Sequence, residues 1–241
     1  MRAFAGERWW VLGLAAVTGP ALVAVAAALT RRRDLGAGAL QPRRGPADAP
    51  PYLSSPLGLA WRLHRGGALG WTAGFAVMGA LFGTLAQSAG QIVRDNPQLA
   101  AVLDRLGGEG VLTDTFLATV FAMMGLVAGG FAVQAVLRLQ SEESALRAEQ
   151  VLSAAVPRSR WAVSHLLMAF TGATVMLTTA GLALGLAHGI RIGQPGEMAR
   201  LAAAAWVQAP AVWVTAGLAM LLYGLLPRLT ALTWAALVAF A

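Results

Sequence analysis

Long apolar runs separated by short charged segments dominate this sequence. A charge-free stretch of about 20 residues is long enough to cross a bilayer as a helix. Five such runs occur, followed by a shorter sixth, and they cover residues 9–29, 67–93, 115–137, 161–190, 201–227 and 229–241. The pattern predicts an all-α fold, a polytopic transmembrane helix bundle with five full spans and a truncated sixth.

The charges between the runs predict how the chain is oriented. Residues 31–65 carry seven arginines against two aspartates, whereas residues 94–114 carry two arginines against four acids. The positive-inside rule therefore makes the first segment cytoplasmic and the second external. Residues 138–160 and 191–200 continue the alternation. The alternation places the first residues outside, which is unusual because Arg2 and Arg8 lie there. This start and the short last run together predict a fragment of a longer membrane protein.

Prolines interrupt the first cytoplasmic segment between residues 41 and 56 and predict an extended linker. We expect a leading transmembrane helix in 1–30 that belongs to a preceding half, a Pro/Arg-rich linker in 31–54, and a transmembrane domain in 55–241 that is incomplete at its C-terminal end. Ser55 and Pro56 can cap and open a short helix lying in the membrane interface. The cytoplasmic start of the second span is an equally good interpretation.

Composition supports a membrane protein and excludes several kinds of site. Hydrophobic residues make up 57% of the chain and charged residues 12%, about half the charge of a soluble domain. Cysteine and lysine are absent, so thiolate sites and a phosphate-binding loop ending in lysine are excluded. The net charge of +7 comes from arginines between apolar runs, which favours membrane topology over nucleic-acid binding. No catalytic residue, metal site or cofactor is predicted.

Within the runs, few side chains could carry chemistry. No acid or arginine lies in the five full runs, which argues against a proton- or sodium-coupled carrier. His165 and His188 lie near opposite ends of the fourth run and are interpreted as solvated anchors. Tryptophans in interfacial belts or helix contacts are Trp71, Trp161, Trp206, Trp213 and Trp234. Gly-x-x-x-Gly pairs favour close helix packing and comprise Gly70–Gly74, Gly79–Gly83, Gly125–Gly129 and Gly181–Gly185.

The second cytoplasmic loop is the most informative segment. Ser141 can cap a short amphipathic helix, Glu143 and Arg147 stand at positions i and i+4, and Pro157 ends the helix. Composition alone favours the alternative, a charged connector between two spans.

At this loop the sequence resembles the membrane subunits of type-two ATP-binding-cassette exporters, and more narrowly the actinobacterial permeases described as exporters of polyketide antibiotics. The matching motifs are Glu142-Glu143-x-x-x-Arg147-Ala148-Glu149-x-x-Leu152, Val156-Pro157-Arg158-x-Arg160-Trp161-x-x-Ser164-His165-Leu166, Arg31-Arg32-Arg33-Asp34-Leu35-Gly36-Ala37-Gly38 and Ser55-Pro56-Leu57-Gly58-Leu59-Ala60-Trp61-Arg62.

The resemblance implies a cytoplasmic coupling helix in residues 142–160 that docks on a separate ATPase subunit, and an interfacial elbow helix in residues 55–65. Residues expected to couple to the ATPase are Glu142, Glu143, Arg147, Glu149, Arg158 and Arg160. A transport cavity is expected to be lined by Trp71, Phe75, Gln87, Phe121 and Met124. The expected partners are the nucleotide-binding ATPase subunit, a second permease half and the lipid bilayer.

The expected function is that of a multi-pass permease subunit in the cytoplasmic membrane, which is not itself an enzyme. It would move hydrophobic or amphipathic molecules outward by alternating access, with ATP hydrolysis supplied by the partner. A membrane scaffold or assembly subunit without a transport path is the alternative, and a neighbouring gene for an ATPase would separate the two. A secondary carrier would need a buried ionisable group elsewhere in the protein.

Overall fold

The computed structural model describes residues 9–31, 48, 50–94, 110–154, 156–226, 230 and 232–239. Within these residues the chain forms helices and turns and no strand. The predicted all-α fold is therefore confirmed. Contacts divide the chain into two units, residues 1–49 and 50–241, which are described separately.

The first unit contains helix α1, Trp9–Arg31. Its 23 residues correspond to about 34 Å of helix, enough to cross a hydrocarbon core of about 30 Å. Within this helix the stretch Ala16–Arg31 is apolar, and all of its described side chains are exposed within the unit. An apolar helix with no packed face of its own is consistent with a lipid environment.

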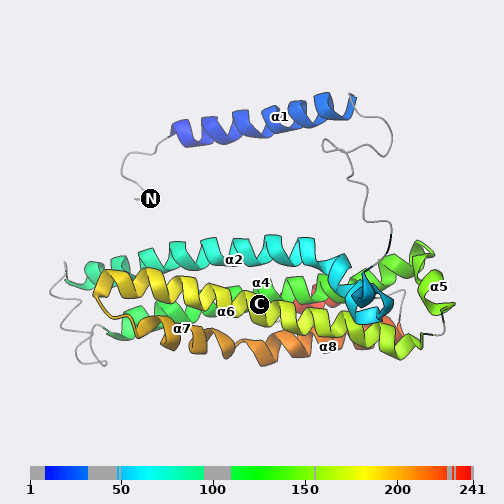
Figure 1. Cartoon of the computed structure of the whole chain (residues 1–241). Helices are drawn as coiled ribbons and strands as arrows, with labels where there is room; N and C mark the ends of the chain where they lie inside the picture. The colour runs from blue at the N-terminus through cyan, green and yellow to red at the C-terminus, as the bar shows by residue number, and fades with distance from the viewer. Residues whose placement is uncertain are drawn as a thin grey trace. The chain divides into compact units, whose positions relative to one another are not determined.

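The second unit is a bundle built on three long helices: α2, Pro56–Arg94; α4, Gly110–Ser144; and α6, Arg158–Ile192. They run side by side in Figure 1, with α6 in contact with both α2 and α4. The bundle is completed by α7, Glu197–Trp206; α8, Ala209–Leu225; and α9, Leu232–Ala239. Among the described residues, four stretches are long and apolar enough to cross a membrane: Pro56–Ala86, Thr113–Ser144, Arg158–Ile192 and Glu197–Leu225.

The fifth predicted span is not one continuous helix. The chain turns at Val207 and Gln208, whose N–H groups each donate to a carbonyl three residues back at 3.2 Å. Pro210 supplies the reason, since it has no N–H to continue the hydrogen-bond ladder and is tolerated only in the first turn of a helix. The span therefore comprises α7 followed by α8, which packs along α4.

Glycines bring α2, α6 and α7 into close contact. A Cβ added at Gly83 would lie 2.5 Å from the carbonyl oxygen of Leu184 in α6, and one added at Gly79 would overlap the carbonyl oxygen of Ala180. On the other side of α6, a Cβ at Gly185 would lie 2.5 Å from Met198 Cα in α7. These contacts confirm the predicted packing role for Gly79–Gly83 and for Gly185.

The stretch predicted as an elbow helix forms the first turns of α2. Ser55 Oγ accepts a hydrogen bond from the Gly58 N–H at 3.0 Å, so the predicted cap is confirmed. A single turn of 3₁₀ helix, η1, Pro51–Ser54, precedes it. The helix continues through Gly66 and Gly67 into the span, and Figure 1 shows its first turns directed away from the long part of α2. A pair of glycines is a common site for such a bend.

Candidate functional site: an apolar pocket and a charged loop

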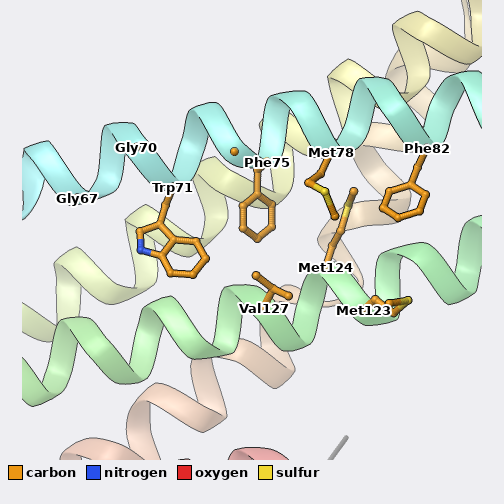
Figure 2. A pocket seen from close by; sticks show the side chains of 10 residues that line it. Gly67, Gly70, Trp71, Phe75, Met78, Phe82, Met123, Met124 and Val127 are labelled. Atoms are coloured by element: carbon orange, nitrogen blue, oxygen red, sulfur yellow. The ribbon is translucent and has the colours of Figure 1, made fainter. Parts of the chain in front are cut away.

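A pocket of about 540 Å³ lies between α2 and α4. Figure 2 shows the aromatic and methionine side chains of α2 on the side of this helix that faces α4. The lining comes from Gly67, Gly70, Trp71, Gly74, Phe75, Met78 and Phe82 of α2 and from Met123, Met124 and Val127 of α4. These positions form a single stripe on α2 because they recur at intervals of three and four residues. None of the lining side chains is charged.

Three of the five residues predicted to line a cavity meet in this pocket: Trp71, Phe75 and Met124. Phe121 is buried in the bundle but is not among the residues that line the pocket. The side chain of Gln87 lies outside the described residues. Which face of each helix borders the pocket depends on how the helices are rotated against one another, and the sequence does not specify this rotation.

Sequence analysis did not identify Gln134, which lies beside the pocket. The Trp71 indole Nε1–H donates to Gln134 Oε1 at 3.2 Å and so joins α2 to α4. The same indole ring packs against Phe75 and Phe131, with centroids 6.5 and 6.3 Å away. An amide inside an otherwise apolar run was the available signal, because a polar group in a membrane span needs a partner.

The charged loop begins where α4 ends. Helix α4 continues through Ser144, the chain reverses at Ala145 and Leu146, and the short helix α5 follows at Arg147–Leu152. Leu146 has a φ of 58°, the left-handed region that leucine rarely adopts, and is 65% exposed. The loop thus exposes an apolar side chain at a residue whose backbone conformation is strained.

A two-pronged ion pair ties this loop to α4. Arg147 Nε lies 2.7 Å from Glu142 Oε2, and its Nη2 lies 3.1 Å from Oε1. Arg138 approaches the same carboxylate at 3.4 Å. Hydrogen bonding to Glu142 raises the pKa of Arg147 above its usual value. Glu142 is only 6% exposed, so removing its partners would leave a buried charge unpaired.

Three local predictions for this loop are wrong. Pro157 does not end the short helix, which stops at Leu152; it is the N-cap residue of α6. Ser141 does not cap a helix; it lies inside α4, and its hydroxyl donates to the Arg138 carbonyl at 2.8 Å. Arg147 pairs with Glu142, five residues earlier, in place of Glu143. Ser141 cannot cap a helix because α4 continues through Ser144. The ion pair changes partner because the αL residue Leu146 breaks the helix, so i, i+4 spacing no longer holds across it. Glu149, Arg158 and Arg160 are exposed, and Glu143 is half-buried.

The prediction of solvated histidines is also wrong. His165 is 1% exposed, and its Nδ1 lies 3.0 Å from Nε2 of His64 in α2. Its ring also packs edge-on against Trp161 at 5.6 Å between centroids. His188 is buried as well, and its Nδ1 lacks a hydrogen-bond partner among the described residues. His64, which sequence analysis did not single out, thus connects the start of α2 to α6 beside the charged loop.

Two interhelical hydrogen bonds support the predicted role of tryptophans as helix contacts. Trp206 Nε1–H donates to Thr178 Oγ1 at 2.8 Å, and Trp213 Nε1–H donates to Thr174 Oγ1 at 3.3 Å. Each bond joins the broken span of α7 and α8 to α6. Both tryptophans are otherwise exposed, and indole donors in membrane helices are expected to find such interhelical partners.

Four membrane-length apolar helices in the described part of the chain indicate a membrane-embedded protein, with an uncharged pocket between two of them and a charged loop at one end. A family described as "Multidrug efflux system permease Rv1217c, C-terminal domain" matches residues 53–241. The chain belongs to this family, and its resemblance to exporter permeases is confirmed. It is also 44% identical over all 241 residues to the multidrug efflux system permease protein Rv1217c of Mycobacterium tuberculosis. The chain spans 44% of the length of that relative.

Proposed function

We propose that the chain is one half of an ATP-binding-cassette exporter permease in the cytoplasmic membrane. A separate nucleotide-binding subunit hydrolyses ATP, and a second permease half completes the transport path. The cargo is a hydrophobic or amphipathic molecule, of which a polyketide antibiotic is the case implied by the family resemblance. The observation that carries this proposal is the loop between α4 and α6, which is clamped to the bundle on one side and exposes charges on the other.

The clamp gives the loop a mechanical role. Because Arg147 holds the Glu142 carboxylate with two hydrogen bonds, a push on α5 moves the end of α4 with it. The paired rings of His64 and His165 lie in the same region and link α2 to α6. Closure of the ATPase would therefore be transmitted to the helices that border the pocket.

The outward side of the loop suits a protein partner. Leu146, Glu149, Arg158 and Arg160 are all exposed, and an exposed leucine between charges is a common feature of an interface core with a polar rim. Arg158 and Arg160 stand in the first turn of α6, where the helix dipole disfavours cations. Contact with anionic lipid or with acidic side chains of a partner explains why basic residues are suitable there.

The pocket supplies the transport path in this proposal. Trp71, Phe75 and Met124 face a space within the usual range of ligand sites, about 300–1,000 Å³. The second permease half would close this space from the open side, and rocking of the two halves would expose it alternately to each side of the membrane.

Charge reversal in the loop, compared with charge reversal at the far end of α6, tests the coupling. The full-length permease is co-expressed with its ATPase subunit and reconstituted in lipid vesicles, and the variant Glu149→Arg/Arg158→Glu/Arg160→Glu is compared with Arg191→Glu in the last turn of the same helix. We expect the loop variant to lose at least tenfold in transport-linked ATP hydrolysis while still inserting, and Arg191→Glu to retain it. Equal activity in both would reject the coupling role and favour a scaffold subunit.

A further inference from the structure

Of the features of the bundle, the pocket between α2 and α4 carries the most specific chemistry. Its length follows from the lining, which extends on α2 from Gly67 to Phe82 and therefore along about 22 Å of helix. Its width varies: three glycines border one end, whereas Phe75, Met78 and Phe82 border the other. A long, narrow and adaptable space of this kind suits an extended chain better than a compact globular molecule.

The glycines at the wide end leave space and are not used for packing. A Cβ built at Gly67, Gly70 or Gly74 meets no atom within 4 Å. By contrast, the backbone of α6 occupies the space beside Gly79 and Gly83 on the same helix. The open glycines therefore widen the pocket next to Trp71, where a head group larger than a methylene chain can be accommodated.

The polar group at that end is a hydrogen-bond donor. Gln134 Oε1 accepts from the Trp71 indole, and this bond orients the amide so that its Nε2 is directed elsewhere. Among the described residues, no acceptor bonds to Nε2. Gln134 lies outside the pocket lining and its side chain is exposed, so its amide donor is accessible beside the pocket to the hydroxyl, ether or carbonyl oxygen of a ligand.

Charge is disfavoured throughout the pocket. No lining residue is acidic or basic, and the charged residues of α4 nearest in sequence, Asp114 and Arg138, lie outside the lining. A cation would gain contact with the faces of Trp71 and Phe75, but it would lose its hydration without any counter-ion, and that loss is the larger effect. The same argument applies to a carboxylate.

We infer that the pocket between α2 and α4 binds an uncharged, single-chain amphiphile, with its oxygen-bearing head at Gln134 and its chain directed toward Phe82. The inference rests on the proposed exporter function and specifies the cargo. Gly70 and Gly74 make room for the head, and Gln134 is the residue that recognises it.

Photolabelling with three probes of equal chain length tests the inference. Hexadecanol, hexadecyltrimethylammonium and hexadecanoate, each with a diazirine at the chain end, are applied to the full-length permease in nanodiscs of phosphatidylethanolamine and phosphatidylglycerol. We expect saturable labelling of residues near Phe82 and Met123 by the alcohol, with affinity at least fivefold above that of either charged probe. Labelling of lipid-facing residues such as Val214 should rise linearly with probe concentration.

Matched leucine variants separate binding from folding. Gly74→Leu should abolish the saturable labelling, whereas Gly217→Leu in α8, where an added Cβ also meets no atom within 4 Å, should leave it unchanged. Gln134→Leu should lower the affinity for the alcohol about three- to tenfold, the effect of one hydrogen bond. A second hexadecanol probe with the diazirine beside the hydroxyl should shift the label toward Trp71.

Labelling that is linear at every position, equal for all three probes or unchanged by Gly74→Leu would overturn the inference. Loss of all labelling once the second permease half is present would overturn it too, because that half would then occupy the pocket. In each case transport-linked ATP hydrolysis with the intact loop would persist, so the proposed exporter function would stand. If ATP hydrolysis did not depend on the charged loop, the exporter function would be rejected separately.

Discussion

The two Gly-x-x-x-Gly pairs of α2 differ although they share one helix and one spacing. Gly79 and Gly83 lie against the backbone of α6, where an added Cβ would collide with carbonyl oxygens. Gly70 and Gly74 border the pocket, where an added Cβ meets nothing within 4 Å. The spacing places each pair on one face of the helix, but only the neighbouring helices determine whether that face is packed or open. One glycine pair of α2 therefore packs against α6, and the other borders the pocket.

Leucine substitution at matched positions should give the largest difference. Gly83→Leu must displace the α6 backbone, whose Leu184 oxygen would be 2.5 Å from the new Cβ, and should destabilise the protein by about 3 kcal/mol or more, beyond ordinary overpacking. Gly74→Leu should leave the melting temperature within a few degrees of the parent protein. Thermal unfolding in detergent, followed by intrinsic fluorescence, measures both, and equal loss in the two variants would remove the distinction between the pairs.

Loss of the histidine contact at the beginning of α2 should have an intermediate effect. His64→Ala removes the ring that lies 3.0 Å from His165 and leaves a buried nitrogen of His165 without this partner, at a cost of about 1–3 kcal/mol. Chemical denaturation of the purified permease measures the change. A control at the exposed Leu57 of the same helix, Leu57→Ala, should cost less than half as much; equal costs would show that the pair adds nothing.

Removal of the Trp71 hydrogen bond should have a smaller effect. Trp71→Phe retains an aromatic ring in the pocket but loses the bond to Gln134, with an expected cost of about 0.5–1.5 kcal/mol. A double-mutant cycle with Gln134→Leu isolates the bond from the lost ring area. Additive effects of the two substitutions would indicate that α2 and α4 are not joined there.

The smallest expected effect has the opposite sign. Gly70→Ala adds a methyl group into open space and replaces the poorer helix former, so it should stabilise the protein by up to about 1 kcal/mol. Gly79→Ala should destabilise it, because the same methyl group meets the Ala180 carbonyl. Unfolding curves of the two variants recorded side by side provide the comparison, and a shared sign would contradict it.

The sequence was sufficient to predict the all-α fold, its long apolar helices and the Ser55 cap, because these depend on local hydrophobicity and spacing. It did not predict the break at Val207 and Gln208, since Pro210 could equally have kinked a continuous helix. The burial of His165 and its pairing with His64 depend on residues that are 101 positions apart, and no local pattern contains that information. The ion pair of Glu142 with Arg147 was missed because a single left-handed residue, Leu146, changes the register.

The central claim is that the loop between α4 and α6 docks on an ATPase subunit. A photocrosslinking residue, benzoylphenylalanine, placed at Leu146 tests it most directly, with Ile190 at the other end of α6 as the matched control, since both side chains are exposed at 65% and 73%. With the co-expressed nucleotide-binding subunit present, we expect a permease–ATPase crosslink from position 146 and none from position 190. Absence of a crosslink from position 146, in a permease that is correctly inserted and co-purifies with the ATPase, would contradict the assignment.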